Sequence, residues 1–291
     1  MNSISAVFIT LRPKQWIKNL FLFAGILFSH HLFDTSMLSR VGAAFLIFCG
    51  LSGAIYLVND LVDVERDRAH PIKSKRPIPS GALSTKAALV ILVVITFTCL
   101  AAASLMGIPF FICAAAYFLL QLAYSFRLKH VVILDVFSIA AGFVIRVVAG
   151  AAVIDVTVSS WLLICTILLS LFLGLSKRRH ELQLLESGAV NHRRVLQEYS
   201  PYLLDQMISV VTASTVVCYA LYTMSAETIE KFGTRNLIFT IPFVLYGIFR
   251  YLYLIHTRGE GGNPETILVS DVPLIVDIVF WAVTALIIIY H

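Results

Sequence analysis

The chain has 291 residues, of which 59% are hydrophobic and only 13% are charged. So apolar a composition cannot make a water-soluble surface; it excludes a soluble globular protein and predicts that the bilayer is the solvent. The net charge of +5 needs no nucleic-acid partner, because membrane topology and anionic small ligands already account for it.

Apolar runs long enough to cross a membrane fill most of the chain. A helix needs roughly 20 residues to cross about 30 Å of hydrocarbon, and backbone polar groups in lipid must be satisfied within the structure itself. We therefore predict an all-α polytopic membrane protein, a bundle of nine transmembrane helices that forms a single domain over residues 1–291. The expected spans are approximately 17–33, 37–59, 84–106, 108–124, 132–154, 161–176, 207–224, 236–256 and 272–290.

The basic residues predict the orientation of these spans. Most Lys and Arg fall at the N-terminus and in alternate loops, including the polar stretches 60–83 and 177–206. The positive-inside rule then places the N-terminus and these stretches in the cytoplasm and the C-terminus on the opposite side of the inner or plasma membrane. The first ten residues lack the basic start and apolar core of a cleavable signal peptide, so we expect the first span to be retained. The five cysteines lie in apolar runs without metal-ligand spacing and are expected to be small apolar residues.

Carboxylates at helical spacing open the first polar stretch. Asn59, Asp63 and Asp67 are four residues apart and are expected on one face of a helix leaving the membrane, with Asp60 beside them. Carboxylates this close repel one another without a cation, and hard oxygen ligands suit Mg²⁺. We predict that these four residues bind magnesium; a solvated helix end with unrelated acids is the alternative.

A basic loop follows the acids directly. His70, Lys73, Lys75 and Arg76 precede Pro77-Ile78-Pro79-Ser80-Gly81. Arginine suits bidentate phosphate contacts, and lysine supplies a point charge. We therefore predict that Lys73 and Arg76 bind phosphate that the metal bridges to the acids.

The stretch from Asn59 to Gly81 resembles the first signature of the UbiA superfamily of intramembrane prenyltransferases. In that family an Asn/Asp-rich helix binds Mg²⁺-diphosphate, and an Arg-Pro-Ile-Pro-Ser-Gly element follows. The resemblance covers essentially the whole chain. It implies a nine-helix bundle with a central cavity open to lipid, Mg²⁺ as the cofactor, and catalytic roles for Asp63 and Asp67 as metal ligands.

The second family signature is incomplete in this chain. Common members place two aspartates four residues apart after a Tyr-Ser element. Here Tyr124-Ser125 leads to Asp135, but neither Val131 nor Ile139 is a carboxylate. We keep Asp135 as a catalytic candidate; the missing acid argues against prenyl diphosphate as the substrate and leaves the expected fold unchanged.

Three further elements resemble one subgroup, the decaprenyl-phosphate phosphoribosyltransferases. They are the runs from Arg12 to Asn19, from Tyr124 to Asp135 and from Gly174 to Leu182. The resemblance implies Mg²⁺-dependent transfer of a 5-phosphoribosyl group from phosphoribosyl diphosphate to a polyprenyl (decaprenyl) phosphate, with release of diphosphate. The substrate-binding candidates in these runs are Lys14, Lys18, Asn19, Tyr124, Lys129, Lys177, Arg178 and Arg179.

The number of cations favours the same pair of substrates. The donor carries a diphosphate and a 5-phosphate, and the acceptor lipid carries a third phosphate group. Lys14, Lys18 and the run from Lys177 to Arg179 exceed what one aromatic carboxylate would need. The alternative is that the positive-inside rule alone places these residues there.

Two other features leave alternatives open. Arg146 lies within a predicted span, about three helical turns and some 16 Å beyond Asp135. Such an arginine must face protein or water, so we count it as a substrate-binding candidate, with structural pairing as the alternative. The glycine-rich loop 259–265 before Asp271 is either a flexible lid or a plain connection.

The predicted chemistry needs no strong base, because the attacking lipid phosphate is already ionised. Holding two anions together and stabilising the departing diphosphate would suffice. Two other functions remain open: a UbiA-type aromatic prenyltransferase that uses prenyl diphosphate and 4-hydroxybenzoate or a quinone precursor, and a membrane transporter with intramembrane charges such as Arg146 and Asp277. No pattern predicts the prenyl length or the oligomeric state, and a homo-oligomer is compatible with the sequence.

Overall fold

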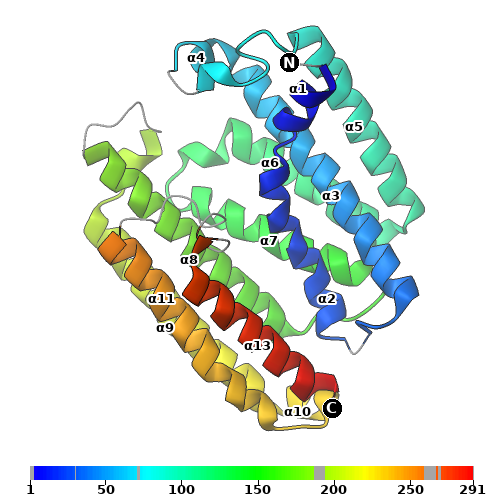
Figure 1. The fold of residues 1–291 in the computed structure, drawn as a ribbon, viewed down its shortest axis with the longest axis vertical. Coiled ribbons are helices and arrows are strands. Elements are labelled where there is room, and N and C mark those ends of the chain that lie inside the picture. The colour runs from blue at the N-terminus through cyan, green and yellow to red at the C-terminus, as the bar shows by residue number, and fades with distance from the viewer. Residues whose placement is uncertain are drawn as a thin grey trace. The chain divides into compact units, whose positions relative to one another are not determined.

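Helices make up the regular structure wherever the computed structural model describes the chain, which is residues 3–29, 31–70, 73–186, 194–258, 267 and 270–290 (Figure 1). Eight helices in these ranges are long and apolar enough to cross a membrane. They are α3 (Thr35–Val62), α5 (Thr85–Leu105), α6 (Ile108–Phe126), α7 (Leu134–Ala152), α8 (Ser160–Glu186), α9 (Pro201–Met224), α11 (Ile241–Arg258) and α13 (Val272–Tyr290). The prediction of an all-α polytopic membrane protein is confirmed.

The first predicted span, 17–33, takes another form. Residues Pro13–Phe23 are a 3₁₀ helix, η1, and Ala24–Leu27 form the short helix α2. At about 2.0 Å per residue for the 3₁₀ part and about 1.5 Å for the α part, the segment is about 28 Å long. That length is close to the hydrocarbon thickness of about 30 Å, so the count of nine spans is approximate and depends on how this segment is classified.

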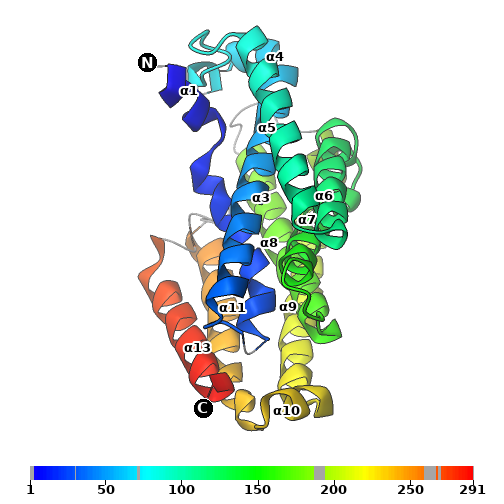
Figure 2. The same ribbon diagram turned by 90° about the vertical axis from the view of Figure 1, so that its right-hand side faces the viewer.

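Glycines permit η1 and α2 to pack closely. A Cβ on Gly150 of α7 would lie 1.9 Å from the backbone oxygen of Leu22, and a Cβ on Gly25 would lie 3.1 Å from the backbone of Ala151. Figure 2 shows this N-terminal segment beside α3. Hydropathy alone contains no information on such backbone contacts, which explains why an ordinary α-helix was predicted.

Contacts divide the chain into two compact units, Met1–Phe126 with Ile145–Thr157 (unit 1), and Arg127–Val144 with Val158–His291 (unit 2). In unit 1, α3 packs against α5, α6 and η1. Its core includes Leu22, Phe48, Phe110 and Tyr117. The helices α1 (Ser3–Thr10) and α4 (Val64–Arg68) also belong to this unit. The single domain over the whole chain remains a prediction.

In unit 2, α8 packs along α9, and α11 contacts both α9 and α13 (Figure 1). The core includes Phe172, Leu204, Tyr251 and Leu254. The short 3₁₀ helices η3 (Leu128–His130) and η4 (Arg194–Glu198) contact one another and precede α7 and α9. Tyr199, which follows η4, is buried in this core.

Candidate functional site

The predicted acidic face spans the end of α3 at Val62, with Asn59 and Asp60 inside the helix and Asp63 after it. Asp63 is the C-terminal cap of α3, and its N–H donates to the Asn59 carbonyl over 3.0 Å. The chain then forms α4, in which the Asp67 N–H donates to the Asp63 carbonyl over 2.8 Å. Helical hydrogen bonding therefore continues across Asp63, although the helix itself is interrupted there.

Asp60 and Asp67 share one cation. Nη1 of Arg76 lies 3.1 Å from Oδ1 of Asp60 and 2.7 Å from Oδ2 of Asp67. Both aspartates are almost fully buried, at 1% and 2% exposure. Nζ of Lys73 lies 3.8 Å from Asp67. The basic loop therefore lies beside the two buried acids; that Lys73 and Arg76 bind phosphate stays a prediction.

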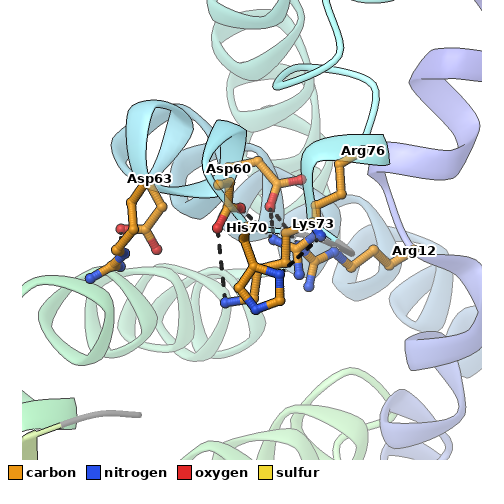
Figure 3. Close-up of polar contacts among 8 residues, drawn as sticks. Arg12, Asp60, Asp63, His70, Lys73 and Arg76 are labelled. Atoms are coloured by element: carbon orange, nitrogen blue, oxygen red, sulfur yellow. Dashed lines mark hydrogen bonds and ion pairs between the residues drawn. The ribbon is translucent and has the colours of Figure 1, made fainter. Parts of the chain in front are cut away.

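Asp63 lies apart from this group, as Figure 3 shows. Its Oδ1 accepts from Nη2 of the neighbouring Arg66 over 2.5 Å, and its side chain is partly exposed. The four predicted metal ligands therefore do not all face one point. The turn at Asp63 and the local ion pair with Arg66 explain the difference from a single helical face.

The loop after Arg76 holds this arginine in place. Ile78 is buried with Leu57 and Leu83 in a small core of unit 1. The Ser80 N–H donates to the Arg76 carbonyl over 2.9 Å. Gly81 has φ of 81°, a left-handed conformation that glycine adopts without steric strain. The Pro-Ile-Pro-Ser-Gly element thus fixes the backbone that presents Arg76 to the two acids.

Arg12 is a member of this cluster that sequence reasoning did not select. Its Nη2 donates to Oδ1 of Asp60 over 2.6 Å, and its guanidinium lies 4.6 Å from the centroid of the Tyr56 ring. Its φ of 51° is left-handed, a costly conformation for a residue with a side chain. The only sequence sign of its role was its place at the start of the Arg12–Asn19 run.

The donor set fits a magnesium ion. Asp60 and Asp67 offer buried carboxylate oxygens around one cationic position, whereas Asp63 is paired with Arg66. Within the part of the chain that the structure describes, no three His, Cys, Asp or Glu side chains form a metal-binding group. A magnesium site does not need three such side chains, because Mg²⁺ commonly keeps water and phosphate oxygens and takes only one or two protein carboxylates.

Asn19 and Arg146 lie together inside unit 1. Nε of Arg146 donates to Oδ1 of Asn19, and Nη2 donates to the Tyr117 hydroxyl, each over 2.8 Å. Asn19 in turn donates to Sγ of Cys49 over 3.3 Å. Asn19 is fully buried and Arg146 is 6% exposed. This geometry matches the structural alternative for Arg146, a buried hydrogen-bonded network.

Asp135 and Arg178 form a buried ion pair in unit 2. Nε of Arg178 donates to Oδ2 of Asp135 over 2.6 Å, and the two side chains are 1% and 0% exposed. Nη1 of Arg178 also donates to Glu181. The sequence predicted a catalytic acid and a phosphate-binding arginine; the structure brings these two residues together as partners of each other.

Tyr199 completes this network and was missed by sequence reasoning, since no motif surrounds it. Its hydroxyl donates to Oδ1 of Asp135 over 2.8 Å and accepts from the Ile133 N–H over 2.7 Å. Ile133 has φ of 68°, an outlier for a β-branched residue. Burial, and then the hydrogen bond to Asp135, raise the pKa of the Tyr199 hydroxyl above its ordinary value. The hydroxyl therefore remains a neutral donor at physiological pH.

Arg179 is held separately from Arg178. Its Nε donates to Oδ1 of Asp205, and its Nη2 donates to Oδ2 over 3.3 Å. Its Nη1 is buried and has no hydrogen-bond partner in the described part of the chain. A buried unsatisfied donor costs about 1–3 kcal/mol, and more when it is charged.

The other predicted substrate-binding residues are less enclosed. Lys14 is exposed, whereas Lys18 is half-buried and donates to Oε1 of Gln15 over 2.6 Å. Tyr124, Lys129 and Lys177 are half-buried. The candidate lid 259–265 lies outside the described residues. Asp271 accepts two hydrogen bonds from Arg250, over 3.0 and 2.8 Å, and thereby ties α13 to α11.

Comparison with protein families gives one match over most of the chain. The profile of the UbiA prenyltransferase family matches residues 19–270. A decaprenyl-phosphate phosphoribosyltransferase of Mycolicibacterium smegmatis is 33% identical over 285 residues, which cover 93% of this chain and 88% of that protein. A protein of the same name from Corynebacterium glutamicum is 33% identical, with 93% of this chain and 82% of that protein covered.

Solved structures with the same fold include a UbiA homologue from Archaeoglobus fulgidus bound to GPP and Mg²⁺. It matches with a TM-score of 0.73 at 20% identity, over 98% of this chain and 100% of that one. A digeranylgeranylglyceryl phosphate synthase matches with a TM-score of 0.70 at 16% identity, over the full length of both chains. At these identities the two likenesses establish the fold alone.

Proposed function

This chain belongs to the UbiA prenyltransferase family, and on that premise we propose that it is a membrane-bound polyprenyl-phosphate phosphoribosyltransferase. In the proposed reaction an oxygen of the lipid phosphate forms a bond to C1 of phosphoribosyl diphosphate. The bond from C1 to the diphosphate breaks, and the diphosphate leaves with the bonding electrons. The observation that carries the proposal is the 33% identity to relatives named for this activity, over nearly the whole chain.

The acid-base cluster of unit 1 is the proposed site for the diphosphate. Asp60 and Asp67, with Asn59 and Asp63 near them, would hold Mg²⁺, which when bound neutralises charge on the diphosphate leaving group. The contacts of Arg76 support this assignment, because its guanidinium already places one positive charge between the two buried carboxylates. Arg76 and Lys73 then donate to the diphosphate oxygens, as charge-assisted phosphate contacts do.

Positioning and electrostatics are the proposed sources of catalysis. The lipid phosphate is ionised, so no residue has to remove a proton from it. The transition state has positive charge on the ribosyl carbon and oxygen and growing negative charge on the diphosphate. Cations held by the fold before the reaction stabilise that negative charge without reorganisation. Asp135 is proposed to act through the cation it holds, since Arg178 covers one of its oxygens and Tyr199 the other.

The proposed orientation follows the distribution of basic residues. The acid-base cluster, together with most Lys and Arg, would face the cytoplasm, with the N-terminus on that side and the C-terminus opposite. The acceptor would then be a membrane lipid with its phosphate at the cytoplasmic surface, and the donor would be a soluble sugar phosphate.

The test is a competition assay between the two candidate reactions, phosphoribosyl transfer and prenyl transfer. Purified protein in nanodiscs receives Mg²⁺ with phosphoribosyl diphosphate, polyprenyl phosphate, prenyl diphosphate and 4-hydroxybenzoate together, and the lipid products are identified by mass. A phosphoribosylated lipid, formed only when Mg²⁺ and polyprenyl phosphate are both present, is the expected result. A prenylated aromatic acid as the main product overturns the substrate assignment and assigns the chain to the other UbiA chemistry.

A further inference from the structure

Two consecutive arginines of α8 have different hydrogen-bonding states. Arg178 donates from Nε to Asp135 and from Nη1 to Glu181, and its side chain is 1% exposed. Arg179 donates from Nε and Nη2 to the two carboxylate oxygens of Asp205. Among the residues that the structure describes, Nη1 of Arg179 is buried without a hydrogen-bond partner, and the residue is only 9% exposed. The two residues are therefore not equivalent members of one cationic cluster.

The Asp205 carboxylate fixes the direction of this unsatisfied donor. Two hydrogen bonds along one edge of a planar guanidinium define its plane, so Nη1 at the other edge is held in one orientation. Native proteins rarely leave a buried charged donor without an acceptor, and each such group requires an explanation. His256 of α11 lies near enough to Arg179 and Asp205 to interact with both electrostatically. The acceptor would therefore lie near Asp205 and His256 in unit 2.

We propose that Nη1 of Arg179 binds a phosphate monoester, with Asp205 as its positioning residue, whereas Arg178 stays paired with Asp135. This inference rests on the proposed function for the identity of the two candidate ligands. A phosphate monoester is present on both, as the 5-phosphate of phosphoribosyl diphosphate and as the lipid phosphate of the acceptor. A phosphate oxygen near Nη1 would satisfy the donor, and the planar guanidinium of arginine is well suited to such an oxygen.

The test measures binding of each candidate separately. The full chain in nanodiscs is titrated with ribose 5-phosphate in one arm and with polyprenyl phosphate in the other, for the wild type and for Arg179→Lys. Lysine keeps the charge but lacks the fork that Asp205 orients. Arg127→Lys is the matched control, because Arg127 is an exposed arginine of the same unit. Thermal unfolding is recorded for every variant.

The expected result is selective. Arg179→Lys should weaken binding of one of the two ligands by about tenfold or more, as for one charge-assisted hydrogen bond, and leave the other within twofold. Arg127→Lys should change neither affinity. Asp205→Asn is the second variant; because it acts only through Arg179, it should weaken the same ligand and no other. The ligand affected identifies which phosphate the donor binds.

Two outcomes overturn the inference. If Arg179→Lys and Asp205→Asn leave both affinities within twofold, Nη1 is satisfied by water. If both ligands weaken equally and the unfolding temperature falls in parallel, Arg179 has a structural role only. The competition experiment for the proposed function is independent of this result. A wild-type protein that binds one of the phosphates through Arg179 but forms no phosphoribosylated lipid would retain the phosphate site and reject the proposed reaction.

Discussion

Arg178 donates from Nε to Oδ2 of Asp135 over 2.6 Å, and the two side chains are shielded from solvent almost completely. A buried charge that loses its partner costs about 3–5 kcal/mol, whereas replacement of both partners by groups of similar size is often nearly neutral. Arg178→Met and Asp135→Leu should therefore each lower the free energy of unfolding by roughly that amount. The double variant should recover part of the loss. Denaturant unfolding in micelles measures all three, and additive losses would show that the pair is not coupled.

Removal of the Tyr199 hydroxyl should lower the free energy of unfolding by a smaller amount, and this loss should depend on pH. Tyr199→Phe leaves the Ile133 N–H without its acceptor and Asp135 without one donor, at a cost of about 1–3 kcal/mol. Because the pKa of Tyr199 is raised in the folded state, its contribution is complete below the ordinary tyrosine pKa of about 10. Above that pH the unfolded state ionises first, so the contribution falls.

Stability measured from about pH 7 to pH 11 tests this sign. The wild type should approach Tyr199→Phe in stability as the pH rises above about 10. A difference between the two proteins that stays constant over this range, or grows, would contradict the assignment of the hydroxyl as a neutral donor to Asp135.

Arg146 should act on stability more than on substrate affinity. It donates to Asn19 and Tyr117 within unit 1, and its guanidinium also lies 4.6 Å from the centroid of the Tyr117 ring. Arg146→Met removes both hydrogen bonds and leaves Oδ1 of the buried Asn19 side chain without this donor. The free energy of unfolding should therefore fall by about 2–4 kcal/mol. Tyr117→Phe should cost about 1 kcal/mol. A variant of Arg146 that folds normally but binds phosphoribosyl diphosphate tenfold more weakly would restore the substrate-binding prediction.

The contrast between the two predicted halves of the site explains what sequence can supply. The acids from Asn59 to Asp67 and the cations Lys73 and Arg76 lie within one short segment, so their proximity follows from local chain geometry. Arg178 and Asp135 lie on different helices, and Tyr199 follows a third element with no motif around it. Their contacts depend on tertiary packing, which neither helical spacing nor hydropathy records.

The spans show the same division. Residues 84–106 and 272–290 were predicted, and the helices are Thr85–Leu105 and Val272–Tyr290. Apolar length and the need to satisfy backbone polar groups in lipid suffice for these. The segment 17–33 is less apolar, since it contains Lys18 and Asn19, and its 3₁₀ part packs with the Leu22 backbone directly against Gly150 of α7. Hydropathy predicted that segment as membrane-spanning without predicting its hydrogen-bond pattern.

The acid cluster predicts loss of metal-dependent turnover without loss of the fold. Asp67→Asn and Asp63→Asn should each reduce turnover at saturating Mg²⁺ by at least roughly 100-fold, as when a group that stabilises transition-state charge is removed. Asp63 remains in this prediction because its pairing with the exposed Arg66 is weak enough to exchange for a metal contact. Glu65→Gln is the matched control, since Glu65 is an exposed acid of the same helix α4. Activity of either aspartate variant equal to that of Glu65→Gln would remove it from the metal site.

Arg12 provides the last prediction, in which two affinities change in opposite directions. Its contact with Asp60 supplies positive charge to a carboxylate that is proposed to bind Mg²⁺. Arg12→Gln removes a competitor of the metal, so Mg²⁺ alone should bind more tightly. The diphosphate of the donor loses a cation at the same time, so phosphoribosyl diphosphate should bind more weakly. Each change should be about tenfold, as for one charge-assisted hydrogen bond.

The fluorescence of Trp16 measures both affinities without turnover. Trp16 lies close to Arg12, and its Nε1 donates to the Leu11 carbonyl over 3.2 Å. The titrations use a Trp161→Phe/Trp281→Phe background, in which Trp16 is the remaining tryptophan. Weaker binding of both ligands would instead identify Arg12 as a structural residue that merely supports Asp60.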